Sequence, residues 1–228
     1  MPKQATVGMV PGTVLGTMSD ILLKIKSGVI TPRELDLFAQ RQNPFAINSI
    51  QEEWQEFYRK YFRLSVDFSD VSIPEEQEDF TRVLFIPQGL TINQAFQACS
   101  KAFKSWSYTN DLDKDVPNND RNTEASYAIR VRDRVEADEE LKNLSANDLQ
   151  KRKISSITLL ERLVYELKYY SETNKHLDIQ NTTLCAGSRH RNGSVPCVYW
   201  SSGLGKLCVD WCHPDSADDG LRGRAVVS

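Results

Sequence analysis

The segment that decides the fold covers residues 158–173 and reads TLLERLVYELKYYSET. Thr158 and Glu161 stand three residues apart and form a capping box, in which both side chains bond the backbone at the start of a helix. Behind this start, apolar side chains recur at three- and four-residue spacing, which is typical of one helix face. These side chains are Leu160, Leu163, Val164, Leu167 and Tyr170. The pattern predicts a helix over 159–173 that packs through this face against a sheet.

Strands are predicted on both sides of this helix in the chain. Residues 126–133 (SYAIRVRD) alternate in character, which indicates a strand with one buried face. Residues 81–86 (TRVLFI) are β-branched and apolar, and they also predict a strand. After the helix, three strand-like segments are separated by turn residues and predict an antiparallel meander. These segments are 182–185, 195–200 and 206–211.

The sequence therefore predicts an α+β fold, in which an N-terminal helical unit precedes a mostly antiparallel sheet and a C-terminal β-meander. Helices at 91–104 and 159–173 are expected to pack on one face of that sheet. We expect three regions along the chain, namely a flexible arm over 1–17, a helical unit over 18–62 and an α+β core domain over 63–228.

The helical unit carries its own start and stop signals. Ser27-Gly28 is expected to end a first helix, because glycine readily closes a helix. Residues 31–34 (TPRE) place threonine, proline and glutamate at the positions that each prefers at a helix start. A third helix is expected over 48–62, where aromatic residues recur at helical spacing.

Composition excludes several classes of protein. The 228 residues include 28 basic and 31 acidic side chains, for a net charge of −3 and a pI near 5.7. These values are ordinary for a soluble globular protein, and they argue against collagen-like, disordered or strongly basic chains. Glycines and a proline interrupt the uncharged stretch 4–19, so we expect neither a signal peptide nor a membrane segment. Five cysteines without an export signal favour reduced thiols and a cytoplasmic location.

An arginine row on the predicted strand at 126–133 is a candidate nucleic-acid contact. Arg130, Arg132 and Arg134 are two residues apart, so they would project from one face about 7 Å from each other. That spacing is comparable to the distance between phosphates along a nucleic-acid backbone. Acidic residues lie beside the row in the sequence, however, and ion pairs on a hydrated sheet face would explain it as well.

Four cysteines near the C-terminus are a candidate metal site. Cys185, Cys197, Cys208 and Cys212 are spaced so that strands of the meander would each carry one or two of them. Four thiolates suit a structural zinc ion, but no C-x2-C pair occurs. Buried cysteines also serve as small apolar residues, and exported proteins form disulfides. Zinc is therefore one interpretation among three, and no other cofactor is expected.

No recognised catalytic motif occurs in the sequence. The three histidines lie outside any metalloprotease pattern, and no phosphate-binding glycine loop or nucleophile elbow is present. Asp111, Asp113 and Asp115 match the first positions of a calcium loop, but the glycine and glutamate that the loop requires are replaced by Val116 and Asn122.

Residues 126–144, 158–178 and the run Leu23–Leu35 resemble an uncharacterised family of bacterial hypothetical proteins. The resemblance implies a bacterial cytoplasmic origin, and it implies no activity, ligand or catalytic residue.

The function expected from the sequence is a non-enzymatic interaction or regulatory module of the cytoplasm. Its partner would be a protein, including a second copy bound through residues 18–62. The alternatives are a nucleic-acid-associated protein that uses the arginine row and a binding domain stabilised by zinc.

Overall fold

The computed structural model describes residues 12–30, 35, 39 and 50–228. The chain divides into two compact units between Asn48 and Ser49. In the first unit, α1 (Gly12–Lys26) ends where Ser27 and Gly28 close it, and Gly28 has a positive φ of 76°. Helix α1 thus begins inside the arm that was expected over 1–17. The helix expected after residues 31–34 lies almost wholly outside the described residues.

The second unit contains the remaining described elements. Its helices are α3 (Ile50–Phe62), α4 (Ile92–Ala102), α5 (Leu112–Asp115), the 3-10 helix η1 (Glu139–Leu141), α6 (Ala146–Lys151) and α7 (Leu159–Thr173). Its strands are β1 (Arg82–Ile86), β2 (Ser105–Ser107), β3 (Asn118–Asn119), β4 (Tyr127–Val131), β5 (Thr182–Leu184), β6 (Ser188–Arg189), β7 (Val195–Ser201), β8 (Lys206–Cys212), β9 (Leu221–Gly223) and β10 (Val226–Val227).

The described strands form three sheets. The first has the order β1-β4-β10 and is antiparallel throughout. The second has the order β2-β8-β7-β5-β9, with the predicted antiparallel meander at its centre and a short parallel strand at each edge. The third is the small pair β3-β6. The predicted α+β class, its mostly antiparallel sheet and its C-terminal hairpin strands are confirmed, although the strands are divided among several sheets.

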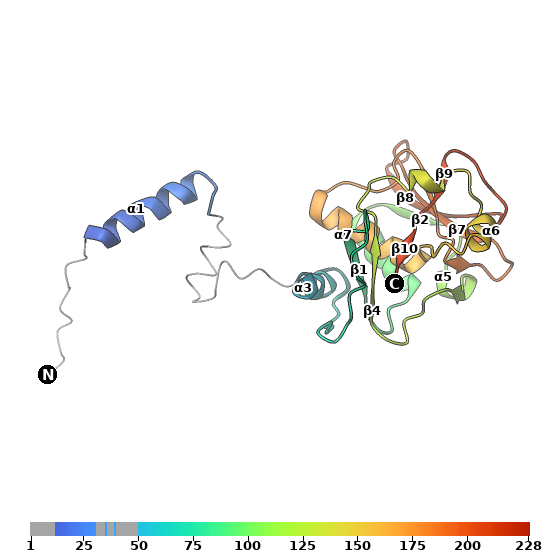
Figure 1. Cartoon of the computed structure of the whole chain (residues 1–228), viewed down its shortest axis with the longest axis horizontal. Helices are drawn as coiled ribbons and strands as arrows, with labels where there is room; N and C mark the ends of the chain where they lie inside the picture. Colours follow the sequence, from blue (N-terminus) through green and yellow to red (C-terminus); the bar gives the residue numbers. More distant parts are fainter. Residues whose placement is uncertain (1–11, 31–34, 36–38, 40–49) are drawn as a thin grey trace. The chain divides into compact units, whose positions relative to one another are not determined.

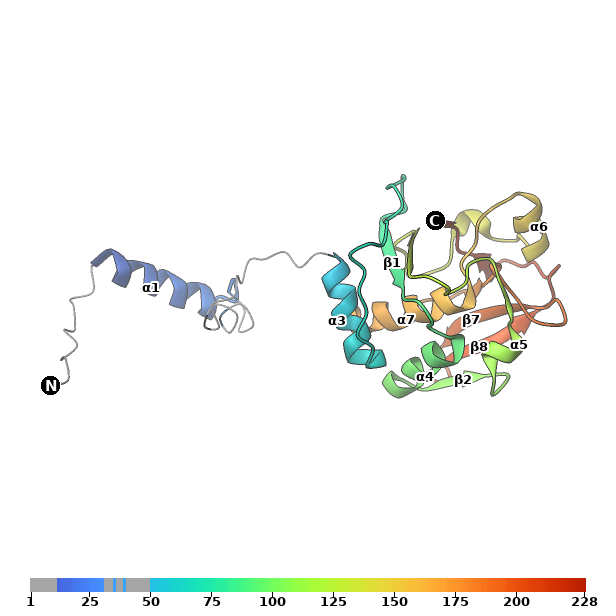
Figure 2. The same ribbon diagram turned by 90° about the horizontal axis from the view of Figure 1, so that it is seen from below.

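Helix α7 is enclosed by the rest of the unit (Figures 1 and 2). It contacts α4, strand β1 of the first sheet and strand β7 of the second. All ten residues from Leu159 to Lys168 are buried, including the charged ones. The prediction of one apolar face was therefore incomplete, because elements on both sides bury the polar face of this helix as well.

The C-terminal tail joins the two larger sheets. No strand is predicted for the polar sequence after residue 213, yet two short strands form there. Strand β9 pairs with β5 at the edge of the second sheet, and β10 then pairs with β4 in the first. These strands are only three and two residues long, so their pairing depends on tertiary neighbours rather than on a local sequence pattern.

Helix α3 packs on the core of the second unit. Trp54, Phe57 and Tyr58 are buried there, and the Tyr58 hydroxyl donates to the Phe85 carbonyl of β1 at 2.6 Å. The observed division of the chain thus groups α3 with residues 49–228, whereas the sequence grouped it with residues 18–62. The buried apolar side chains form two clusters, a larger one around α7 and a smaller one between the second sheet and α6.

Candidate functional site

The three arginines of the predicted row all have partners within the chain. Arg130 donates to the Pro74 carbonyl at 2.7 Å and lies 3.5 Å from a Glu76 carboxylate oxygen. The other two arginines pair with acids that follow β4 in the chain. Arg132 donates to Asp138 at 2.6 Å, and Arg134 donates to both Glu140 oxygens at 2.8 and 2.9 Å. Their positive charge is therefore largely balanced, as the ion-pair interpretation anticipated.

The four predicted cysteine ligands are not gathered at one point. Cys185 is fully buried in the larger cluster, on the α7 side of the second sheet. Cys197 and Cys212 belong to the smaller cluster, and their Sγ atoms are 3.0 Å apart. The Cys208 thiol donates to the Lys206 carbonyl at 4.0 Å. Among the residues that the structure describes, no three His, Cys, Asp or Glu side chains are placed to hold a metal ion.

The aspartates of the calcium-like loop are also committed to protein partners. Asp113 accepts from the backbone amide of Ile92 at 2.7 Å, at the first turn of α4. Asp115 accepts from the Thr109 hydroxyl at 2.6 Å and pairs with Arg191 at 3.0 Å. These carboxylates cap helices and join loops in the structure.

A buried charge network, which the sequence analysis missed, surrounds Asp178. One Asp178 oxygen accepts from Arg162 of α7 at 2.8 and 2.9 Å, and the other accepts from Arg224 at 2.7 Å. Arg162 also donates to Glu166 at 2.8 Å, and Glu166 lies 2.9 Å from His176 Nδ1. The two arginines, Asp178 and Glu166 have side chains no more than 1% exposed.

The side chains of the network stay ionised because each one contacts a side chain of opposite charge. Burial acts to raise the pKa of Asp178, but Arg224 and Arg162 outweigh it and hold that pKa below its usual range. Burial opposes the charge on Arg162, but Asp178 and Glu166 more than compensate and raise its pKa. None of these four residues lines any of the three cavities described below. We therefore assign the network to structure, where it joins α7, the segment before β5 and the C-terminal tail.

A second buried group begins with the predicted capping box. Thr158 and Glu161 bond each other's backbone amides as expected. Glu161 also accepts from Arg121 at 2.6 Å and from the Tyr127 hydroxyl at 2.9 Å. Burial and then the Glu161 charge raise the pKa of Tyr127, so its hydroxyl stays protonated as a donor. The polar groups around Glu161 bond one another and the helix start, so we also assign this group to structure.

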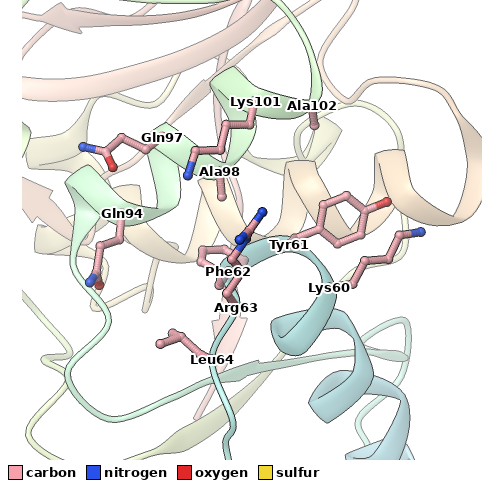
Figure 3. Close-up of a pocket in the computed structure, with 10 residues that line it drawn as sticks. All are labelled: Lys60, Tyr61, Phe62, Arg63, Leu64, Gln94, Gln97, Ala98, Lys101 and Ala102. Carbon is pink, nitrogen blue, oxygen red and sulfur yellow. The ribbon is translucent and has the colours of Figure 1, made fainter.

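A groove lined by cations lies between the C-terminal end of α3 and helix α4 (Figure 3). It has a volume of about 460 Å³, within the range of small-molecule sites. Three of its ten lining residues are cations, Lys60, Arg63 and Lys101, and none is acidic. In Figure 3 the Arg63 and Lys101 side chains project into the space between the two helices. We call this feature the basic groove.

Local helix chemistry explains how the basic groove is built. Arg63 follows α3 with a positive φ of 59°, and the Leu64 amide donates back to the Tyr58 carbonyl at 3.3 Å to close the helix. Lys60 and Lys101 lie in the last turns of α3 and α4, where cations are favoured by the helix dipole. Dipole compensation alone would account for one cation per helix end. It does not require three cations to line one carboxylate-free concavity.

Two smaller cavities of about 290 Å³ each provide a contrast. One is lined by Asp120, Lys153 and Arg189 together with seven uncharged residues, and the other includes Asp113 and Arg121. Both contain carboxylates beside their cations. The basic groove is thus distinguished by both its size and the single sign of its charge.

The cations of the basic groove form no ion pair with any residue in the described part of the chain. No carboxylate oxygen of a described residue lies within 4.0 Å of the charged nitrogens of Lys60, Arg63 or Lys101. The Lys60 ammonium instead lies 5.0 Å from the centre of the Tyr61 ring. Gln94 and Gln97 of α4 add amide groups that both donate and accept hydrogen bonds.

Comparisons with known proteins give no relative. No protein-family model, curated protein or solved structure matches the chain. The resemblance to bacterial hypothetical proteins therefore stays a prediction. Among the described residues, no helix is both long enough and apolar enough to cross a membrane.

Proposed function

We propose that this protein is a non-enzymatic binding module that takes a phosphate-bearing ligand of nucleotide size in the basic groove. The observation that carries the proposal is that Lys60, Arg63 and Lys101 line a groove of about 460 Å³ without an acidic residue, and that Arg63 and Lys101 project into it. The proposal keeps the binding role expected from the sequence. It moves the contact with the anionic ligand from the arginine row, of which only Arg130 lies on β4, to the ends of α3 and α4.

Charge and size together support this ligand class. A carboxylate-free concavity concentrates positive potential locally, even though the whole chain carries a net charge of −3. Arginine donates in a fork that matches phosphate oxygens, and lysine adds point charges that can follow several phosphate positions. The groove volume suits a small molecule rather than an extended duplex.

The lining chemistry favours binding over turnover. None of the ten lining residues is a histidine, cysteine, serine or carboxylate, so Lys60, Lys101 and Tyr61 are the only lining side chains of the types that act as general bases or nucleophiles. A cytoplasmic location is part of the same proposal. It is supported by the five cysteines in the sequence, because thiols persist in reducing compartments.

Calorimetric titration of the full chain tests the proposal directly. The probes are adenosine triphosphate, inorganic phosphate and a single-stranded DNA dodecamer, each at low and moderate salt. We expect the nucleotide to bind with an affinity that falls as salt rises, because the contacts are ionic. Tighter binding of the dodecamer would favour the nucleic-acid alternative, and binding of none of the probes would refute the proposal.

Matched variants locate the site. Lys101→Glu reverses a charge inside the groove and should weaken nucleotide binding by about tenfold or more. Lys151→Glu makes the same change at an exposed position of α6, outside the groove, and should leave binding unchanged. Equal affinities for the two variants would contradict the assignment. The nucleotide recovered after incubation should be intact, and a hydrolysed product would overturn the non-enzymatic part of the proposal.

Self-association through the first unit is a second candidate function. Helix α1 exposes Met18, Leu22 and Leu23, with Leu22 and Leu23 each 65% exposed. Apolar side chains clustered on an exposed helix favour contact with another apolar surface. Leu22→Asp should then lower the mass measured by light scattering. Leu204→Asp, on the turn between β7 and β8 with the same 65% exposure, serves as the control.

A further inference from the structure

Cys197 and Cys212 form a close thiol pair across two neighbouring strands. Cys197 lies on β7 opposite Asp210, and Cys212 lies on β8 opposite Val195, so the two cysteines are diagonal neighbours. The Cys212 thiol donates to Cys197 Sγ at 3.0 Å. A disulfide requires about 2.05 Å between the sulfurs, so a closure of about 1 Å would join them.

The surroundings give the two thiols different exposure. Cys197 is 4% exposed and packs in the smaller core cluster with Leu184 and Val195, whereas Cys212 is half-buried at the end of β8. A reagent from solvent therefore reaches Cys212 first. Cys197 lies directly behind it, in position to attack a sulfur adduct formed on Cys212.

The electrostatics of the pair also separate the two thiols. When Cys197 is the donor of the shared hydrogen bond it holds its proton more tightly, and this bond, then burial, raise the pKa of Cys197. The hydrogen bond that Cys197 can return lowers the pKa of Cys212, against burial and the nearby carboxylates of Asp210 and Asp218. Once Cys212 ionises, Cys197 becomes the donor. Cys212 is thus the better nucleophile of the two.

The other three cysteines have neither feature. Cys99 is fully buried and its thiol donates to the Leu163 carbonyl at 3.5 Å. Burial raises the pKa of both Cys99 and Cys185. Cys208 is also buried, at 2% exposure, on the same strand as Cys212. Among the cysteines, only Cys212 combines access to solvent with a sulfur partner.

We propose that Cys197 and Cys212 are a redox-active dithiol that closes to a disulfide by exchange with a low-molecular-weight disulfide. Cys212 thiolate attacks one sulfur of the small disulfide, the S–S bond breaks, and one small thiolate leaves. Cys197 then attacks Cys212 Sγ in the mixed disulfide and expels the second small thiolate, which takes the Cys197 proton. The net reaction oxidises two protein thiols and reduces one small disulfide to two thiols.

Mass spectrometry of the full chain, incubated with oxidised glutathione without denaturant, tests this reaction. The wild-type chain should lose two mass units, and alkylation after unfolding should label three cysteines instead of five. Trypsin cleaves after Lys206, so the peptide that holds Cys197 should be linked to the peptide that holds Cys208 and Cys212. Cys208→Ser should keep this link, which identifies Cys212 as the partner.

Two further variants separate the roles of the thiols. Cys197→Ser should accumulate one glutathione adduct on Cys212, because the second attack is lost. Cys212→Ser should gain neither an adduct nor a crosslink over the same interval. The proposal is overturned if the wild-type chain keeps five free thiols, if another pair of cysteines forms the link, or if Cys212→Ser reacts as fast as the wild type. Far-ultraviolet circular dichroism of each variant shows whether it is folded, and Cys208→Ser controls for a buried cysteine change.

Discussion

The Asp178 network and the basic groove are two regions where charged side chains gather. The charges of the network are buried and paired, whereas those of the groove are exposed and all positive. In the network, Arg162 and Arg224 share Asp178, and Glu166 completes the set at full burial. In the basic groove, three cations face solvent without a carboxylate. Buried charges must be paired because an uncompensated charge in a low dielectric is very costly. Surface cations carry no such requirement, so leaving them together preserves a site for a ligand anion.

The largest expected effect comes from breaking the network. Asp178→Asn should leave the charges of Arg162 and Arg224 incompletely compensated and lower the free energy of unfolding by about 3–5 kcal/mol. Urea denaturation monitored by tryptophan fluorescence measures this loss. Asp70→Asn, at an exposed position, should change stability by less than about 0.5 kcal/mol. Similar losses in the two variants would show that the network contributes no more to the free energy of unfolding than an exposed carboxylate does.

Acid should weaken the network in the wild-type chain. The pKa of Asp178 is lower in the folded chain than the value near 3.9 expected when unfolded, so its contribution is complete above that value. It is lost as pH falls through the lower, folded-state pKa. Unfolding free energies measured from pH 7 to pH 2 should therefore fall in the acid range. Asp178→Asn should give a shallower fall, and parallel profiles would contradict the contribution of this carboxylate.

In the basic groove, replacing Arg63 should raise the stability of the chain and lower its affinity for nucleotide. Arg63 has a positive φ of 59°, a conformation that costs a non-glycine residue about 1 kcal/mol. Arg63→Gly should stabilise the chain by up to about that amount while weakening nucleotide binding. Lys153→Gly, which relieves a positive φ of 55° outside the basic groove, should stabilise without affecting binding. Thermal unfolding and calorimetry provide the two readouts, and a loss of stability in Arg63→Gly would be the contrary result.

The smallest effect is expected in the arginine row. Arg134 and Glu140 are 36% and 48% exposed, and exposed ion pairs contribute little. Arg134→Ala should change the free energy of unfolding by less than about 1 kcal/mol and leave nucleotide affinity unchanged. A clear loss of binding to single-stranded DNA in this variant would instead restore the nucleic-acid alternative for the row.

The hairpin strands and the basic groove differ in how far the sequence could predict them. Turn residues and alternation placed β7 and β8 within one residue of their observed limits, because both signals are local. The basic groove brings residues 60–64 against residues 94–102, and neither segment carries a binding motif. A signal was nevertheless present, since residues 94–104 (QAFQACSKAFK) contain two lysines and no acid. Only the contact of α3 with α4 joins these cations to those of α3.

Helix α7 shows which features the sequence could predict, namely its limits, and which it could not, namely the partners of its charged side chains. Thr158 and Glu161 define its first turn, and the helix covers Leu159–Thr173 as the apolar spacing predicted, because capping and periodicity act within a few residues. The sequence could not show that Glu161 would meet Arg121, or that Arg162 would meet Asp178. Arg121 and Asp178 lie in loops outside α7, and the tertiary structure brings them against the helix. Local hydrogen bonds and side-chain spacing thus determined the elements, while burial from several sides decided which charges are paired and which remain available to a ligand.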